Sequence, residues 1–193
     1  MNLLAALLAI LPAVHAADFV PPDTKEIVTQ ARAGAAEAEL AAFLDNLGDG
    51  VYEGSSGELS RDGAAYDLIE TRVIVQRKTL HGHPGATLRL LRRAALKANP
   101  AHVESADAEL SLEIAGGSLL VLRDGKADAA AHLDQAPSAH AVVATWRDAY
   151  YRYHPEVVET LSLTLKDGVL IVERARSTGG SERERESFSA ARR

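Results

Sequence analysis

The chain has 193 residues, no cysteine, and a formal net charge of −6 from 21 basic and 27 acidic residues. The lack of cysteine excludes disulfides and thiolate metal sites. The negative charge argues against a nucleic-acid partner and against binding to an anionic membrane surface.

The first residues have the pattern of a secretory signal. An apolar run from Leu3 to Val14 ends just before His15-Ala16, and the small residues at that junction predict cleavage after Ala16. The run is too short to span a membrane, which takes about 20 apolar residues. We therefore expect a signal peptide at residues 1–16, export to the periplasm or the medium, and no integral membrane segment. A buried N-terminal helix is the alternative, although the run has no polar face.

Residues 17–48 are predicted to form an extended leader followed by a helix. Pro21 and Pro22 keep the leader out of a helix interior. Apolar residues then recur at helical spacing, and Gly48 is typical of a C-terminal helix cap. Gly34 leaves two shorter helices as an alternative.

In residues 49–193 the pattern changes to a period of two. Apolar and polar residues alternate in Ile69–Val75, Glu109–Ile114 and Thr160–Leu165, as they do in sheets with one buried face. Glycine-bearing turns separate such runs, and their short length favours an antiparallel domain of about nine or ten strands. The turns are Arg61-Asp62-Gly63, Gly116-Gly117, Arg123-Asp124-Gly125 and Lys166-Asp167-Gly168.

Two segments are ambiguous. Ala86–Asn99 fits a helix slightly better than a strand, because Arg89, Arg92 and Arg93 would share one helical face, whereas a strand would place Arg92 among leucines. Residues 181–193 alternate in charge and form either the closing strand or a solvated tail.

The segment Gly50-Val51-Tyr52-Glu53-Gly54, which follows one helix and precedes a series of antiparallel hairpins, resembles the start of lipocalin-like (calycin) β-barrels. In that family the first strand carries Gly-x-Trp, and Tyr52 stands where the family has tryptophan. The resemblance covers residues 47–193 and implies an antiparallel barrel with a ligand inside it or at its mouth. A β-sandwich, or an open sheet packed by the N-terminal helix, is the alternative.

Aromatic residues gather in Trp146–Pro155, which holds the only tryptophan and three of the five tyrosines. Placed before a proline-marked turn, they would line the mouth of a barrel and stack on a ligand. Trp146 filling the core, with the tyrosines packed over a rim, is the alternative. The basic stretch Arg89–Lys97 could bind phosphate or an acidic partner, or it forms a solvated face balanced by nearby carboxylates. The candidate ligand-binding residues are Trp146, Tyr150, Tyr153, Tyr52 and Arg89.

His81 and His83 are candidate metal ligands. On an extended strand both imidazoles lie on the same face and reach one ion. Such a site needs a third ligand, and the glycines and proline around the pair describe an exposed loop equally well.

No catalytic motif is present in the sequence: it has no Gly-x-Ser-x-Gly elbow, no His-Glu-x-x-His and no phosphate-binding glycine loop. We therefore expect no cofactor and a binding role. The first hypothesis is an exported module that holds a small apolar or amphipathic ligand. The alternative is a structural or interaction protein with a filled core, and an enzyme comes third.

Overall fold

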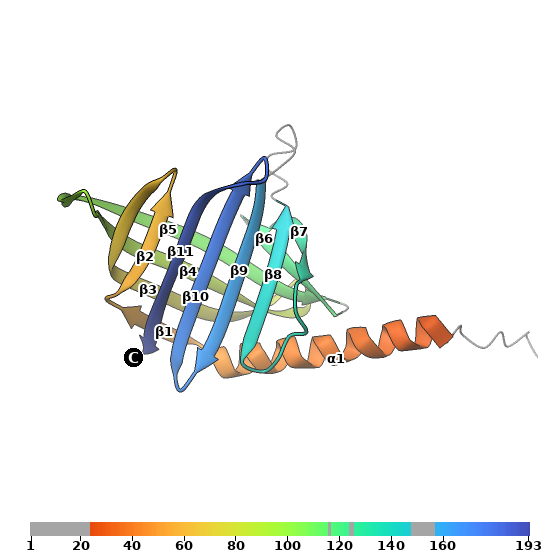
Figure 1. The fold of residues 1–193 in the computed structure, drawn as a ribbon. Coiled ribbons are helices and arrows are strands. Elements are labelled where there is room, and N and C mark those ends of the chain that lie inside the picture. The colour runs from red at the N-terminus through yellow and green to blue at the C-terminus, as the bar shows by residue number, and fades with distance from the viewer. Residues whose placement is uncertain (1–23, 116, 124–125, 148–156) are drawn as a thin grey trace, which may run out of the picture.

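The computed structural model describes residues 24–193, except for 116, 124–125 and 148–156, and it describes no side chains in 24–33 or 123–130. The predicted signal peptide at residues 1–16 lies outside this part of the chain. The described residues form one helix and a single sheet of eleven antiparallel strands (Figure 1). The prediction of an N-terminal helix followed by a mainly β, antiparallel domain is confirmed, with more strands than the nine or ten expected.

The helix α1 spans Thr24–Leu47 without a break at Gly34. The strands follow in chain order and are β1 (Gly50–Gly54), β2 (Gly57–Arg61), β3 (Ala64–Leu80), β4 (His83–Leu96), β5 (Asn99–Ala115), β6 (Ser118–Arg123), β7 (Lys126–Leu133), β8 (Ala141–Arg147), β9 (Val157–Lys166), β10 (Val169–Thr178) and β11 (Ser181–Arg192).

The sheet closes into a ring because β1 and β2 both pair with β3 on one side and with β11 on the other. The two short strands keep the same register on β3 and act as one strand interrupted at Ser55 and Ser56. The seam is tight: a Cβ on Gly54 would lie 2.2 Å from the Ser189 carbonyl oxygen, and a Cβ on Gly57 would lie 2.6 Å from Phe188 Cβ. Only glycine fits at both positions.

The predicted hairpin turns after Arg61 and after Lys166 are confirmed, because they join β2 to β3 and β9 to β10. Asp62 and Asp167 adopt positive φ angles of 47° and 52°, which short polar side chains tolerate. Residues 116 and 124–125, in the other two predicted turns, lie outside the described residues.

The segment Ala86–Asn99, which the sequence left open between a slightly favoured helix and a strand, forms β4 and enters β5. In the strand, Ala86 and Leu88 are buried on the inner face, whereas Arg89 is exposed on the outer face. Arg92 also points into the ring, where glutamates of another strand pair with it. A buried arginine is unfavourable without such partners, and the sequence around it gave no sign of them.

Residues 181–193 contain the closing strand, β11, and Glu186, Phe188 and Ala190 on it are buried. The alternation expected over Ile69–Val75 is interrupted by a β-bulge in β3. Register with β4 shifts between Leu68 and Glu70, so Ile69 is turned outward and 40% exposed.

Helix α1 covers one end of the ring (Figure 1). Its buried residues join the apolar core formed by the inner faces of the strands, and that core includes Ile114, Leu170 and Val172. Tyr52 is fully buried there, and its hydroxyl donates a 2.6 Å hydrogen bond to the Leu47 carbonyl at the end of the helix. Among the described residues, no helix is both long enough and apolar enough to cross a membrane. The core-facing residues of α1 are Leu40, Phe43, Leu44 and Leu47.

Candidate functional site

Beyond the apolar core, eight charged side chains inside the ring form a continuous ladder of ion pairs. Arginine and glutamate alternate along it, so each charge in the middle has an opposite charge on both sides. We call this set the ionic ladder. Its contacts are Glu104–Arg61 at 2.9 Å, Arg61–Glu184 at 3.2 Å, Glu184–Arg92 at 2.8 Å, Arg92–Glu186, Glu186–Arg174 at 3.9 Å, Arg174–Glu159 at 2.9 Å and Glu159–Arg176 at 3.9 Å.

Arg92 carries the ladder across the ring. Its own strand, β4, pairs with β3 and β5, yet its guanidinium contacts Glu184 and Glu186 on β11. The Glu186 side chain is 2% exposed, and that of Arg92 is 12% exposed. The ladder therefore ties opposite walls of the ring together through groups that are largely withdrawn from water.

The pKa values within the ladder reflect burial and pairing. Burial lowers the pKa of Arg92, and the hydrogen bond and charge of Glu184 offset this only in part. Burial alone would raise the pKa of Glu184, but the hydrogen bond and charge of Arg92, with the charge of Arg61, hold it below its ordinary value. The lowered pKa keeps Glu184 charged at neutral pH, and a guanidinium such as that of Arg92 is not deprotonated in proteins.

The charge alternation in β11 has the period of a strand. Glu184 and Glu186 point into the ring, whereas Arg183 and Arg185 are exposed on its outer face. On the neighbouring strand β10, Arg174 and Arg176 share the inner face. The sequence analysis missed these inward charges. The sequence feature that could have revealed them is a repeat of two residues: glutamates recur at this spacing on β11, and arginines of opposite charge recur at it on β10.

A cavity of about 250 Å³ lies inside the ring, between β4 and β5 on one side and β8, β9 and β10 on the other. One end of the ionic ladder supplies its charged lining, and leucine side chains from opposite walls supply much of its apolar lining. The lining residues are Leu90, Ala108, Glu109, Leu110, Trp146, Glu159, Leu161, Arg174 and Arg176.

Trp146 is the predicted ligand-binding residue that the structure places on this cavity. The side chain is 3% exposed, and its indole Nε1 is buried without a hydrogen-bond partner among the described residues. A buried indole N–H normally has an acceptor, because leaving it unpaired costs about 1–3 kcal/mol.

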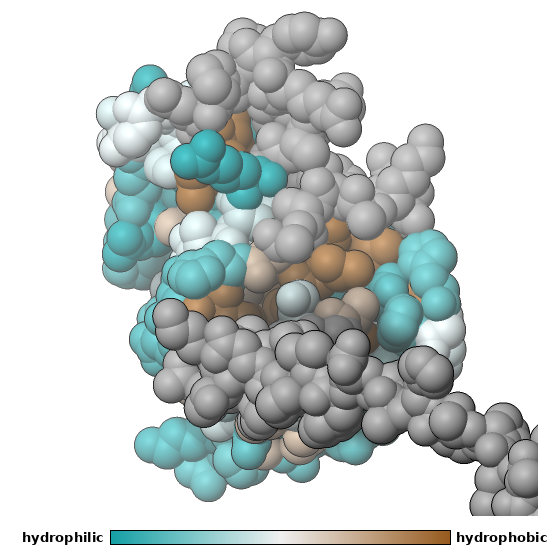
Figure 2. Space-filling view, turned by 90° about the vertical axis from the view of Figure 1, so that its right-hand side faces the viewer, coloured by the Kyte–Doolittle hydropathy of each residue, from teal (hydrophilic) through white to brown (hydrophobic). Residues whose placement is uncertain are grey.

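The pairing of the wall next to this cavity is short among the described residues. There, β5 pairs with β6 from Ser111 to Ala115, and β7 pairs with β8 through His132 and Leu133. Figure 2 looks at the ring from the side of β6, β7 and β8, and shows apolar side chains gathered at the middle of this face with polar side chains to either side.

The other predicted ligand-binding residues do not join Trp146. Tyr52 is buried at the α1 end of the core, where burial raises the pKa of its hydroxyl and the charge of Arg192 lowers it in part. Arg89 is exposed on the outer face of β4, and its Nε lies 2.9 Å from Asp107 Oδ1. Tyr150 and Tyr153 lie outside the described residues.

Of the two candidate metal ligands, His81 lies in the turn between β3 and β4, and His83 is the first residue of β4. Both are exposed, and His81 Nδ1 lies 2.8 Å from the carboxylate of Glu113, which is buried. In the part of the chain that the structure describes, no three histidine, aspartate or glutamate residues gather to hold a metal ion. The third ligand that a site at His81 and His83 requires is therefore missing from that part.

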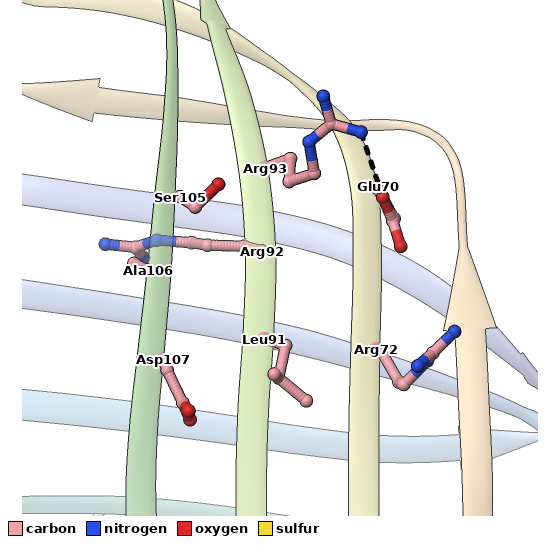
Figure 3. A pocket seen from close by; sticks show the side chains of 8 residues that line it. All are labelled: Glu70, Arg72, Leu91, Arg92, Arg93, Ser105, Ala106 and Asp107. Atoms are coloured by element: carbon pink, nitrogen blue, oxygen red, sulfur yellow. Dashed lines mark hydrogen bonds and ion pairs between the residues drawn. The ribbon is translucent and has the colours of Figure 1, made fainter.

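A second hollow, of about 320 Å³, lies over β3, β4 and β5, and Figure 3 shows the side chains that line it. Charged groups around it are paired: Arg93 with Glu70 at 3.4 Å, and Arg72 with Glu53 at 2.8 Å. In the described part of the chain, none of the residues that line this hollow has a buried polar side-chain atom without a hydrogen-bond partner, in contrast to Trp146.

Comparisons with models of protein families, with curated proteins and with solved structures found no match to this chain. The geometry of the cavity at Trp146 is therefore the basis for any statement about function.

Proposed function

We propose that the protein is an exported binding module with a lipocalin-like barrel, and that it holds a small amphipathic molecule in the cavity at Trp146. The observation that carries the proposal is the buried indole N–H without an acceptor among the described residues, beside an apolar wall in the same cavity. A ligand with a polar end and an apolar body would satisfy both.

The closed antiparallel ring with one helix at its end supports the barrel assignment, since small barrels of this kind enclose ligands between their walls. Helix α1 and the apolar core fill one end, which leaves the region of the ionic ladder for a ligand. The cavity is smaller than the 300–1,000 Å³ of typical ligand sites. The ligand is therefore small, or part of it projects from the cavity.

A structural or interaction protein is the second candidate. The apolar core and the ionic ladder occupy much of the ring interior, as they would in a protein with a filled core. Ile69 and Val103, on β3 and β5, are each 40% exposed and would contribute to a surface for a partner protein.

Native mass spectrometry of the protein purified from the periplasm tests the proposal. We expect a retained small molecule and its loss in the variant Ala108→Phe, because a phenyl ring would fill the cavity. Ala101→Phe, an exposed position on the same strand, is the matched control and should retain the ligand. A mass equal to that of the protein alone, together with no response of Trp146 fluorescence to added amphiphiles, would favour the interaction protein.

A further inference from the structure

We propose that β5 binds an extended segment of a partner protein along its free edge, and that this segment alternates apolar and basic residues. The segment would add one strand to the sheet beside β5 and fill a gap in the wall of the ring. This role goes beyond the proposed function, because it needs no small ligand in the cavity at Trp146.

One edge of β5 is free over much of the strand. On one side, β5 pairs with β4 without interruption from Val103 to Glu113. On the other side, its pairing with β6 runs from Ser111 to Ala115. Among the described residues, none pairs with this second edge between Val103 and Leu110. The N–H and C=O groups of such an edge are a template for another chain.

The gap arises because β6 is short. Its Leu122 lies opposite Ser111, and the strand ends at the next residue, Arg123. A partner segment in line with β6 would continue the wall from that point, antiparallel to β5. A segment of about eight residues would cover the free edge, because paired strands match residue for residue.

The outward side chains along this edge are acidic. Asp107 and Glu109 are both exposed. On β4, Arg89 lies opposite Glu109, but its Nε lies 2.9 Å from Asp107 Oδ1. On the free side of β5, no described strand offers Glu109 a cation. Because opposite charges on directly opposed residues stabilise paired strands, the outward residues of the partner are basic.

The inward side chains next to β6 are apolar. Ala108 and Leu110 line the cavity of about 250 Å³ that Trp146 lines from β8. An inward side chain of the partner would lie beside the small Ala108 and reach this cavity, so it is apolar. Further along the inner face, Glu104 is already paired with Arg61 at 2.9 Å. The partner therefore has the period of two of a strand with one buried face.

An octapeptide of alternating valine and lysine tests the proposal. The controls are an octapeptide of alternating valine and glutamate, and one with four valines followed by four lysines. We expect the first peptide to bind about tenfold or more tightly than either control in calorimetry, because like charges across an interface are unfavourable and the block peptide cannot separate its charges from its apolar face.

N-methylated peptides distinguish strand pairing from charge attraction alone. Alternate N–H groups of a strand point to opposite edges, so methylation of all lysine nitrogens or of all valine nitrogens removes the donors of one edge only. One of these two peptides should bind like the unmodified peptide, and the other should bind much more weakly. Equal affinities of the two would contradict pairing with β5.

Charge reversal places the peptide on this edge. Glu109→Lys should weaken binding of the valine–lysine peptide about tenfold or more and strengthen binding of the valine–glutamate peptide. Glu70→Lys, at an exposed carboxylate on β3, is the matched control and should leave both affinities unchanged. An equal effect of the two variants would overturn the assignment to β5.

Two further outcomes would show that the partner strand is wrong. If amphiphiles bind at Trp146 and none of the peptides binds, the proposed function stands and the partner strand does not exist. If sedimentation shows that the protein alone is a dimer that the valine–lysine peptide dissociates, a second copy of the chain occupies the edge instead.

Discussion

The two ends of the ring interior are filled by opposite chemistry. Under α1, leucine, isoleucine and valine side chains pack into a continuous apolar core that Tyr52 and Phe43 complete. Beyond it, the ionic ladder crosses the ring and reaches glutamates that are almost fully buried. Apolar packing tolerates changes in pH and salt, whereas buried ion pairs depend on every partner being present and charged.

The contrast indicates that the charged end of the ring is the better candidate for a binding site. The apolar end is closed by a helix and by a tyrosine hydroxyl with its hydrogen bond made. The charged end contains the cavity and the buried indole N–H without a partner among the described residues. Natural folds leave polar groups unsatisfied mainly where a ligand, a water or a reaction needs them. Variants at the two ends should therefore behave differently.

The largest effect is expected from Arg92→Met. Removing this guanidinium leaves Glu184 and Glu186 facing each other in a largely dry interior. Loss of one partner from a buried ion pair destabilises a protein by about 3–5 kcal/mol. Urea unfolding followed by circular dichroism measures the change in the free energy of unfolding.

The matched variant Arg92→Met/Glu186→Leu removes both charges of the closest pair. It should recover a substantial part of the lost stability, because the buried carboxylate is no longer left alone. A double variant as unstable as the sum of two single variants would show that the ladder does not act as a coupled unit.

Leu47→Ala tests the other end. The side chain is fully buried beneath the ring, and truncation of such a leucine costs about 2–5 kcal/mol. We expect its loss of stability to be the same at neutral and at acid pH, whereas that of Arg92→Met should shrink at acid pH, where protonation removes the uncompensated charge of the glutamates. Equal pH dependence of the two losses in thermal unfolding would remove the distinction between the two ends.

The sequence predicted the fold where local chemistry determines it. Three features can be interpreted from neighbouring residues alone. They are the helical spacing before Gly48, the alternation in Thr160–Leu165 and the aspartate-glycine turns. Strand β4 stayed open between helix and strand, with a slight preference for a helix, because its arginines also fit one helical face. The partners that make a buried Arg92 acceptable lie on β11, more than ninety residues away.

The candidate site was predictable only in part. Trp146 was named because aromatic residues gather around it, and it does line the cavity. Arg174 and Arg176 were missed, because a charged pair on alternate residues of a strand looks the same whether it faces water or the interior of a ring. Only closure of the sheet decides between them, and closure depends on β1 and β2 meeting β11.

Tyr52→Phe should have a smaller effect than either truncation. The ring remains and continues to fill the core, but the Leu47 carbonyl loses the 2.6 Å hydrogen bond from the hydroxyl. Such a loss costs about 1 kcal/mol. Thermal unfolding measures it, and ligand binding at Trp146 should not change. A large fall in affinity would instead support the prediction from the sequence that Tyr52 contacts the ligand.

The smallest effect is the difference in acid response between Glu184→Gln and the wild type, and its sign follows from the pKa of Glu184. The pKa of this carboxyl is lowered in the folded state, since Arg92 and Arg61 favour its charged form over the opposing effect of burial. Its contribution to stability is therefore full above the pKa of the unfolded chain and is lost as the pH falls through the lower, folded value. Glu184→Gln should be less stable than the wild type at pH 7 and should lose less stability on acidification, as seen by unfolding at a series of pH values. Leu47→Ala, which leaves the ladder intact, should keep the acid dependence of the wild type. If the free energy of unfolding falls with pH as steeply in Glu184→Gln as in the wild type, acid acts on the fold through carboxylates other than Glu184.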